Sequence, residues 1–363
     1  MAKRVLVGMS GGVDSSVTAW LLQQQGYECI GATMKLYNNE TVDRKGYTCC
    51  ALDDVEDARA VARRLGIRHY VFNFQEEFDR CVIRNFADTY AAGSTPNPCY
   101  QCNRYLKFGK LLQRARELDI DYVATGHYAR ITQLPGGRWA LRKGAEAARD
   151  QSYFLACMDQ EQLSRTLFPL ADLPKAEVRR IAEEQGFVNA RKHDSQDICF
   201  VPDGDYVGFL ERYNGRKYEP GPILDQQGKV LGTHRGAISY TLGQRKGLGV
   251  SAPEPLYVCG KSMAENTVIL GPESALFSRR LIADDICWGA LPTLEGPTRL
   301  RAKVRYRHTE QPAVAEVLPD GRLQVTFDEP QRAITTGQTV VLYEGDMVLA
   351  GATIRAVEEG GGL

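Results

Sequence analysis

The residues Ser10-Gly11-Gly12-Val13-Asp14-Ser15-Ser16 have the types and the spacing of a phosphate-binding turn. They follow a short apolar run and precede Val17, Trp20 and Leu21 at helical spacing, so the glycines separate a predicted strand from a predicted helix. Adjacent glycines allow a tight turn, and the N–H groups and positive end of a following helix attract a phosphate. Asp14 and the serines can cap the helix, and Asp14 can also hold Mg2+. The stretch therefore predicts a site for a nucleotide phosphate.

Two of the ten cysteines are candidate nucleophiles. Cys102 lies in the proline-rich segment 94–103, which we predict to be a loop ahead of a helix. A thiol at a helix N-terminus has a lowered pKa and is more reactive. Cys199 lies at the end of the region of alternating strands and helices, and Cys99 forms a Cys-x-x-Cys motif with Cys102. We assign no chemistry to the adjacent Cys49-Cys50.

Alternating strand and helix signals over the first two hundred residues predict a parallel sheet covered on both faces. The predicted strands are residues 5–7, 29–34, 69–74 and 121–129. The last contains Thr125-Gly126-His127, and ligands of open α/β sheets collect at the carboxyl ends of strands. Gly126 and His127 are therefore candidate contacts for nucleotide or substrate.

Three further patterns organise the rest of the chain. Phe78, Val82, Phe86 and Tyr90 form a helical core stripe, on which Cys81 is also expected to pack. Residues 136–143 predict a hairpin, and Pro174 is expected at the first position of a helix that reaches residue 185. Short strands and turns then predict a small central domain, residues 205–280, and an all-β barrel, residues 281–363, after a first domain of residues 1–204. Residues 360–362 are expected to be disordered.

The composition excludes several classes of protein. The 363 residues include 45 Lys and Arg and 45 Asp and Glu, so a nucleic acid would need local basic patches. No apolar run is long enough to span a membrane, and the first residues leave no room for a signal peptide. We therefore expect a cytoplasmic protein, with thiols rather than structural disulfides.

The chain resembles one family over essentially its whole length. The Ser-Gly-Gly-x-Asp-Ser loop resembles that of the ATP-pyrophosphatase superfamily, and it lacks the Gly-Lys-Ser/Thr of a Walker loop. In order follow Thr-Pro-Asn-Pro before Cys102, Thr-Gly-His-Tyr-Ala, Arg-Asp-Gln-Ser-Tyr-Phe-Leu and Ile-Cys-Phe-Val around Cys199. This order is similar to that of the tRNA-specific 2-thiouridylases.

The resemblance implies an α/β fold and an activity. The fold is a Rossmann-like ATP-pyrophosphatase domain, a small central domain and a C-terminal β-barrel. The enzyme would replace O2 of the wobble uridine in Lys, Glu and Gln tRNAs by sulfur, after ATP adenylates O2. Sulfur would arrive as a persulfide on Cys199 from a cysteine desulfurase or a sulfur-relay protein. Cys102 would release it as sulfide or close a transient Cys102–Cys199 disulfide.

The resemblance also implies binding residues, in a protein expected to be a monomer. ATP with Mg2+ would lie on Gly8, Met9, Ser10, Gly11, Gly12, Val13, Asp14, Ser15, Met34 and Gly126. The target base would meet Asn97, Pro98 and Cys99. Other tRNA contacts would be His127, Arg149, Asp150, Gln151, Arg305, Tyr306 and Gln338.

Two positions depart from the family pattern. Cys99 stands where the family often has Asp, and Arg149 stands where it has Lys, which preserves a phosphate-pairing charge. With Cys102 and Cys199, Cys99 could supply three thiolates to an iron–sulfur cluster, or to zinc. Such clusters usually have four cysteine ligands, so we favour the persulfide route, which needs only two thiols.

A basic strand can be predicted without the family. Every second residue from Arg299 to Arg307 is cationic, which on a strand would place five cations on one face and Tyr306 on the other. This face predicts an RNA contact, with a solvated barrel face as the alternative. The inward orientation conflicts with a tRNA role for Tyr306 unless the strand bulges.

Two other functions compete with tRNA thiolation. A small-molecule ATP-pyrophosphatase, such as an argininosuccinate or NAD synthetase, would need neither two reactive thiols nor a basic barrel. A non-enzymatic RNA-binding protein would leave the phosphate loop without a use.

Overall fold

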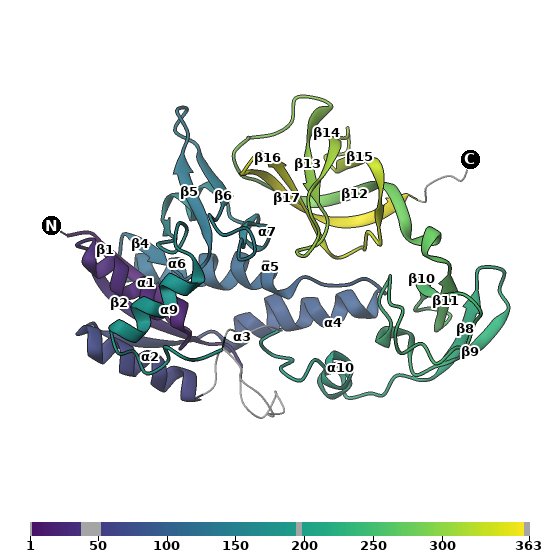
Figure 1. Ribbon diagram of the computed structural model, residues 1–363, viewed down its shortest axis with the longest axis horizontal. Helices are drawn as coiled ribbons and strands as arrows, with labels where there is room; N and C mark the ends of the chain where they lie inside the picture. The colour runs from purple at the N-terminus through teal and green to yellow at the C-terminus, as the bar shows by residue number, and fades with distance from the viewer. Residues whose placement is uncertain (1, 38–51, 194–197, 359–363) are drawn as a thin grey trace.

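The computed structural model describes residues 2–37, 52–193 and 198–358 of the chain. Cys49-Cys50, residues 194–197 before Cys199, and the glycine tail lie outside the described residues. Figure 1 shows an N-terminal α/β region on the left, a barrel above and to the right, and a smaller β region at the lower right. None of the helices within the described ranges is long and apolar enough to cross a membrane.

The predicted parallel sheet is confirmed. Its strand order is β3-β2-β1-β4-β7, and all four pairings are parallel. From β1 the chain adds β2 and β3 on one side of the sheet, and it then crosses back to add β4 on the other side of β1. The strand order therefore reverses between β1 and β4. Ligands bind at such a reversal in open α/β sheets. The strands are β1 (Arg4–Gly8), β2 (Glu28–Lys35), β3 (His69–Asn73), β4 (Tyr122–Ala124) and β7 (Thr166–Leu167).

Helices cover the sheet and extend toward the other domains (Figure 1). They are α1 (Val13–Gln24), α2 (Leu52–Leu65), α3 (Gln75–Phe78), η1 (Asp79–Ile83), α4 (Arg84–Ala91), α5 (Pro98–Cys102), η2 (Asn103–Lys110), α6 (Leu111–Glu117), α7 (Ser152–Leu155), α8 (Gln160–Ser164), α9 (Lys175–Glu184) and α10 (Tyr206–Asn214). The segments α3-η1-α4 and α5-η2-α6 each form one continuous rod, because η1 and η2 are π-helical turns within it. The core stripe is confirmed, since Phe78, Val82, Phe86 and Tyr90 are all buried.

Two local predictions were wrong in their extent. The strand expected over residues 121–129 ends at Ala124, because the backbone turns at Thr125-Gly126 and starts a new strand at Ala129. Pro174 precedes the first helical position of α9 and is its N-cap, with extended backbone.

The C-terminal region forms the predicted closed barrel. Six antiparallel strands close through pairing of β12 with β17, in the order β12-β15-β14-β13-β16-β17. Their bounds are β12 (Phe277–Trp288), β13 (Thr298–Lys303), β14 (Gln311–Val317), β15 (Leu323–Arg332), β16 (Thr339–Glu344) and β17 (Met347–Glu358), with η4 (Glu273–Leu276) just before. Small and branched side chains such as Ala302, Ala315 and Val340 fill its interior.

The hairpin is longer than the predicted residues 136–143, since its first strand begins at Ala129, and its position is one that the sequence does not reveal. It consists of β5 (Ala129–Gln133) and β6 (Trp139–Lys143), and β6 pairs with β17 of the barrel. Figure 1 shows it standing beside the barrel. The hairpin therefore joins the α/β region to a barrel formed two hundred residues later.

The central region is a four-stranded sheet in the order β10-β11-β8-β9. Its elements are β8 (Gly221–Asp225), β9 (Val230–His234), η3 (Ala237–Ser239), β10 (Tyr257–Ser262) and β11 (Thr267–Gly271). Phe209 and Leu210 of α10 and Ile238 of η3 pack in the same core cluster as the Phe78–Tyr90 stripe, so this region is attached to the α/β domain by shared apolar packing.

Candidate active site

The glycine turn lies where β1 ends and α1 begins. Gly11 has φ +75°, and a Cβ at this position would lie 2.3 Å from the carbonyl oxygen of Asp54, so only glycine fits. Gly12 is the N-cap of α1, and no side chain among the described residues caps it. The first N–H groups of α1 therefore face a site suited to an anion.

The second wall of this site is the turn after β4. A Cβ on Gly126 would lie 2.8 Å from the backbone of Asp14 and 3.0 Å from the amide nitrogen of Ser15. Gly126 thus lets the β4 turn touch the start of α1. Met34 lies near the carboxyl end of β2, beside β1 in the sheet. The structure brings the predicted ATP residues together at one edge of the sheet.

Asp14 has a different local role from the one expected. Its two carboxylate oxygens lie 2.7 and 2.8 Å from Lys175 Nζ, and Tyr128 donates a hydrogen bond to it at 2.8 Å. The hydroxyls of Ser15 and Ser16 donate to the carbonyl oxygen of Gly12. The expected helix caps were therefore wrong, because Asp14 instead pairs with a lysine from α9. A carboxylate engaged in this way does not fit the expected Mg2+ ligand.

Two residues from beyond α9 hold the loop in place, and the sequence analysis missed both. Asn189 donates to the carbonyl oxygen of Gly11 and to Ser16 Oγ, each at 2.9 Å. Lys192 Nζ donates to Asp54 and Asp57 of α2 at 2.5 and 2.6 Å. Neither belongs to a recognisable motif, so only their position in the fold identifies them.

The first candidate thiol lies inside a helix. Asn97 caps α5 by accepting from the amide of Tyr100 at 3.3 Å, and Pro98 is the first helical residue. Cys99 follows as the second residue and is exposed, while Cys102 is the fifth and is buried. The loop expected here is thus a helix start, and Cys102 lies deeper in the helix than predicted.

The second thiol lies in the same core cluster as the first. Cys102 is a buried member of the cluster around Phe78 and Phe200, and the half-buried Cys199 packs against that cluster. This shared packing brings together two regions almost a hundred residues apart in the chain. Throughout the described ranges, no three His, Cys, Asp or Glu side chains converge to hold a metal ion. Cys99, Cys102 and Cys199 therefore do not fit a cluster in this arrangement.

A lysine that the sequence analysis also missed links the nucleotide edge to the thiol helix, the α5-η2-α6 rod that carries Cys99 and Cys102. Lys107 Nζ of η2 is 3.4 Å from His127 Nε2, and His127 Nδ1 is 2.7 Å from Thr125 Oγ1. Burial, reinforced by the Lys107 charge, holds the pKa of His127 well below its ordinary value, so the imidazole is neutral. No carboxylate in the described part of the chain pairs with Lys107, which makes it available to a substrate anion.

Several predicted tRNA contacts are hydrogen bonded within the protein, and of these Asn97 and Asp150 are buried while Gln151 and Gln338 are half-buried. Asn97 donates to Thr339 of the barrel at 3.1 Å, and Gln338 donates to the carbonyl oxygen of Pro96 at 2.8 Å. Asp150 accepts from Ser152. Gln151 accepts from the amide of Tyr128. These residues join segments of the fold, whereas Arg149 and Cys99 are exposed.

The basic strand is shorter than predicted. β13 ends at Lys303, so Arg305 and Tyr306 lie in the following turn and the five-cation face does not form. Arg305 is half-buried and donates to the carbonyl oxygen of Ala333 at 2.9 Å. Arg299 pairs with Asp328 on β15, an acid that the local run did not reveal. Tyr306 therefore does not take the inward orientation of a strand residue, and its ring packs against Phe154 in a tilted arrangement with centroids 4.5 Å apart.

Comparison with known proteins defines the class and then the family. Residues 3–203 match the model described as tRNA methyl transferase HUP domain, residues 207–272 its PRC-barrel domain, and residues 278–354 the aminomethyltransferase beta-barrel domain. These models together define a three-domain class of tRNA-directed proteins. The tRNA-specific 2-thiouridylase MnmA of Geotalea uraniireducens is 51% identical over 97% of this chain and 95% of its own length. The protein of the same name from Symbiobacterium thermophilum is 50% identical over 98% and 92%.

The chain therefore belongs to the family of tRNA-specific 2-thiouridylases. Among solved structures, a 4-thiouridine synthetase–RNA complex with bound ATP matches at a TM-score of 0.35 and 18% identity, covering 55% of this chain and 45% of that one. At these values the likeness adds nothing to the argument.

Proposed function

We propose that this protein is an ATP-dependent tRNA 2-sulfurtransferase acting on the wobble uridine of Lys, Glu and Gln tRNAs. The observation that carries the proposal is identity near 50% to 2-thiouridylases over almost the whole of both chains. Two features of the fold support it: an uncapped glycine turn at the reversal point of a parallel sheet, and two cysteines in one core cluster.

The first step is adenylation of the uracil. ATP occupies the turn from Gly8 to Ser15, with Met34 and Gly126 beside the nucleoside. O2 of the uracil attacks the α-phosphate and pyrophosphate leaves, which converts O2 into a good leaving group. Lys107 stabilises the charge that develops on the phosphate, since it lies on the thiol helix and contacts the β4 turn.

The second step transfers sulfur. The outer sulfur of a persulfide on Cys199 attacks C2, and AMP leaves with O2. The Cys102 thiolate then attacks Cys199 Sγ, which closes a Cys102–Cys199 disulfide and leaves sulfur on C2. An external thiol reductant restores both thiols. The persulfide comes from a cysteine desulfurase or a sulfur-relay protein.

The chemistry is tested by mass spectrometry of tRNA nucleosides together with pyrophosphate release. With purified protein, ATP, tRNA and a persulfide donor, we expect the mass of uridine to change by replacement of oxygen by sulfur. An unchanged uridine mass, with all four components present and the tRNA bound, would contradict the proposal.

The two steps are separated by variants. Cys199→Ser should stop thiolation and leave tRNA-dependent pyrophosphate release intact, because activation precedes sulfur attack. Lys107→Met should lower pyrophosphate release on the order of a hundredfold, the scale of one lost electrostatic contact in a transition state. Cys259→Ser, in the central sheet, and Lys110→Met, which removes a surface pair with Glu77, are the controls. Labelled sulfur on Cys102 of the Cys199→Ser protein would reverse the assigned roles.

The role of Cys99 has its own test. We expect protein purified without oxygen to be colourless and free of iron, and Cys99→Ser to thiolate tRNA. A brown protein that loses both its iron and its thiolation activity in Cys99→Ser would establish a cluster route.

A further inference from the structure

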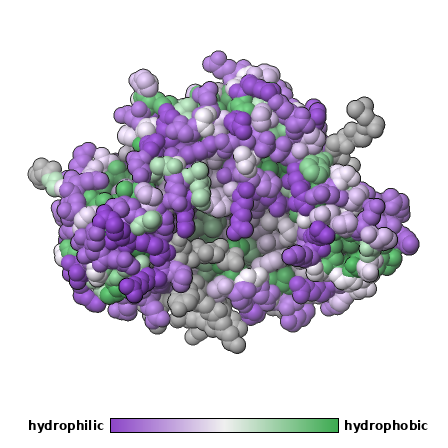
Figure 2. All heavy atoms as spheres, in the orientation of Figure 1, coloured by the Kyte–Doolittle hydropathy of each residue, from purple (hydrophilic) through white to green (hydrophobic). Residues whose placement is uncertain are grey.

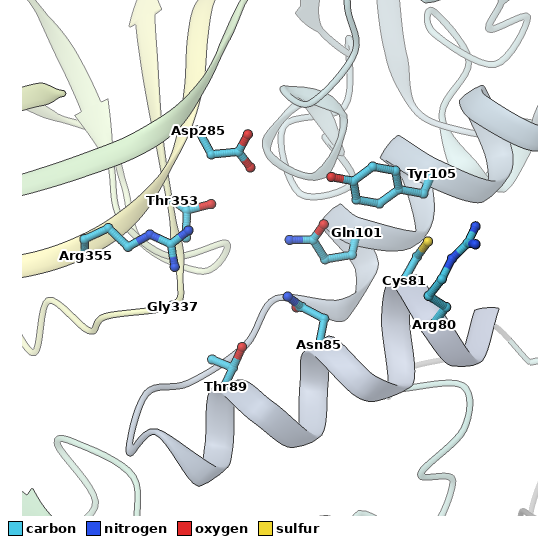
Figure 3. Close-up of a pocket in the computed structure, with 10 residues that line it drawn as sticks. All are labelled: Arg80, Cys81, Asn85, Thr89, Gln101, Tyr105, Asp285, Gly337, Thr353 and Arg355. Carbon is cyan, nitrogen blue, oxygen red and sulfur yellow. The ribbon is translucent and has the colours of Figure 1, made fainter. Parts of the chain in front are cut away.

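A pocket of about 320 Å³ lies between the α/β domain and the barrel, and none of the predicted site residues lines it. Figure 3 shows its lining converging from the α3-η1-α4 rod, from α5 and η2, and from the barrel. The volume is at the lower end of the range of ligand sites in proteins. The lining residues are Arg80, Cys81, Asn85, Thr89, Gln101, Tyr105, Asp285, Gly337, Thr353 and Arg355.

The backbone around this pocket departs from regular geometry on three sides. Arg80 and Cys81 lie in the π-helical turn η1, and Tyr105 lies in η2. Asp285 has φ +52° and sits where the pairing of β12 with β17 shifts register. Such turns and bulges redirect side chains and concentrate at functional sites. Here they aim side chains from three elements into one space.

The lining can recognise both parts of a nucleotide. Arg80 has no carboxylate partner in the described part of the chain, so it can pair with a phosphate. Asn85 and Gln101 offer amide donors and acceptors for the edge of a base. Tyr105 is 42% exposed, and the Arg104 guanidinium lies 5.3 Å from the centroid of its ring. An exposed aromatic ring is the usual stacking partner of an unstacked base.

The pocket lies beside the proposed reaction site. Gln101 immediately precedes Cys102 in the helix. Tyr105 lies three residues after Cys102, so Cys102 and Tyr105 are neighbours on the same helix. On the barrel side, Gly337 adjoins Gln338, whose side chain binds the turn before α5. A nucleotide in the pocket would therefore lie close to a uridine held at the thiol helix.

We propose that this pocket holds a nucleotide adjacent to the target uridine in the single-stranded anticodon loop. The base stacks on Tyr105 with its edge toward Asn85 and Gln101, and its phosphate meets Arg80. On the face seen in Figure 2, hydrophilic residues predominate. This inference rests on the proposed function, because it takes tRNA as the substrate.

The test is a coupling experiment on binding. Dissociation constants are measured for wild type, Asn85→Leu and Tyr105→Leu with intact tRNA and with tRNAs that lack one base on either side of the target. We expect each variant to bind intact tRNA roughly tenfold more weakly. One of the two abasic tRNAs should bind wild type and variants alike, because the contact is already missing.

Controls make every outcome decisive. Arg84→Met lies on the same rod as Asn85 but outside the pocket, and should match wild type with all tRNAs. Tyr105 is exposed, so its replacement keeps the test valid even if Asn85→Leu unfolds. Additive losses at both flanking positions, or a variant that binds intact tRNA normally, would overturn the proposal. So would tight binding of free uridine monophosphate without coupling to tRNA. A wild-type protein that neither binds nor thiolates tRNA would instead refute the proposed function.

Discussion

At the scale of single residues, the ion pair between Asp14 and Lys175 determines the shape of the phosphate site. The Lys175 side chain is 7% exposed and that of Asp14 is 29% exposed, so the lysine depends on this carboxylate for compensation. Losing one partner of a buried pair leaves an uncompensated charge, which destabilises a fold more than losing both. Asp14 thus contributes to stability as well as to any contact with ATP.

Asp14→Asn is expected to abolish pyrophosphate release, because the Asp14–Lys175 pair shapes the loop proposed to hold the phosphates. It should also lower the free energy of unfolding by about 2 kcal/mol, a moderate loss because the pair is partly exposed. The double variant Asp14→Asn with Lys175→Met should regain most of the stability and none of the pyrophosphate release. Urea unfolding and pyrophosphate assays measure the two effects. Full activity in the single variant would remove the phosphate site from this loop.

His127 should make the fold sensitive to acid. Its pKa is held below the ordinary value of 6.5 first by burial and then by Lys107, so the folded chain resists a proton that the unfolded chain accepts. Stability from this residue is therefore complete above about pH 6.5 and falls as the pH drops below it, by at most about 1.4 kcal/mol per pH unit. His127→Gln should flatten that dependence in urea unfolding between pH 7 and pH 5. The exposed His193→Gln is the control, and an equal slope in both variants would contradict the prediction.

At the scale of elements, β13 shows how a charge pattern depends on where a strand stops. Arg301 is exposed on the strand, whereas Arg305 lies beyond its end and binds the backbone of Ala333. Arg301 and Arg305 both belong to the run in which every second residue is cationic, but their surroundings in the structure differ. Only the first is positioned to meet a phosphate from solvent.

Arg301→Ala should weaken tRNA binding and lower the slope of log K against log salt by about 0.7 to 0.9 for one lost phosphate contact. Arg305→Ala should mainly lower the free energy of unfolding, because it removes internal hydrogen bonds. Binding titrations over a range of salt concentrations separate the two. An unchanged slope for Arg301→Ala would mean that this strand faces only water.

At the scale of the whole molecule, the barrel is held against the α/β domain by close backbone approach. Gly337 has φ +83°, and a Cβ there would lie 2.8 Å from both the carbonyl oxygen of Thr95 and Thr89 Cγ2. Beside it, Gln338 binds Pro96, and β6 pairs with β17. The pocket and the turn before the thiol helix both border this junction.

Gly337→Ala should therefore lower the free energy of unfolding by several kcal/mol and weaken tRNA binding. Gly321 is a matched control, since it has φ +82° but nothing within 4 Å of a Cβ. Gly321→Ala should cost only about 1 kcal/mol, the strain of a positive φ. Equal losses in the two variants would show that the junction tolerates the extra atom.

The sequence by itself determined the local elements and the family. The glycine turn after β1, the Phe78–Tyr90 stripe and the barrel strands follow from spacing, since backbone geometry converts short periodic patterns into helices and strands. The ordered motifs around Cys102 and Cys199 indicated the family that the relatives then showed. These signals are contained within segments of a few tens of residues.

Only the tertiary structure decided how those elements meet. Asp14 and Lys175 are 161 positions apart, and the hairpin at residues 129–143 pairs with a strand that begins at Met347. Because β13 ends at Lys303, Arg305 and Tyr306 likewise do not follow the two-faced alternation of strand side chains. Such contacts depend on packing between distant segments, and no local period encodes them. The pocket at the junction is the clearest case, because its lining comes from five separate stretches of the chain, between Arg80 and Arg355.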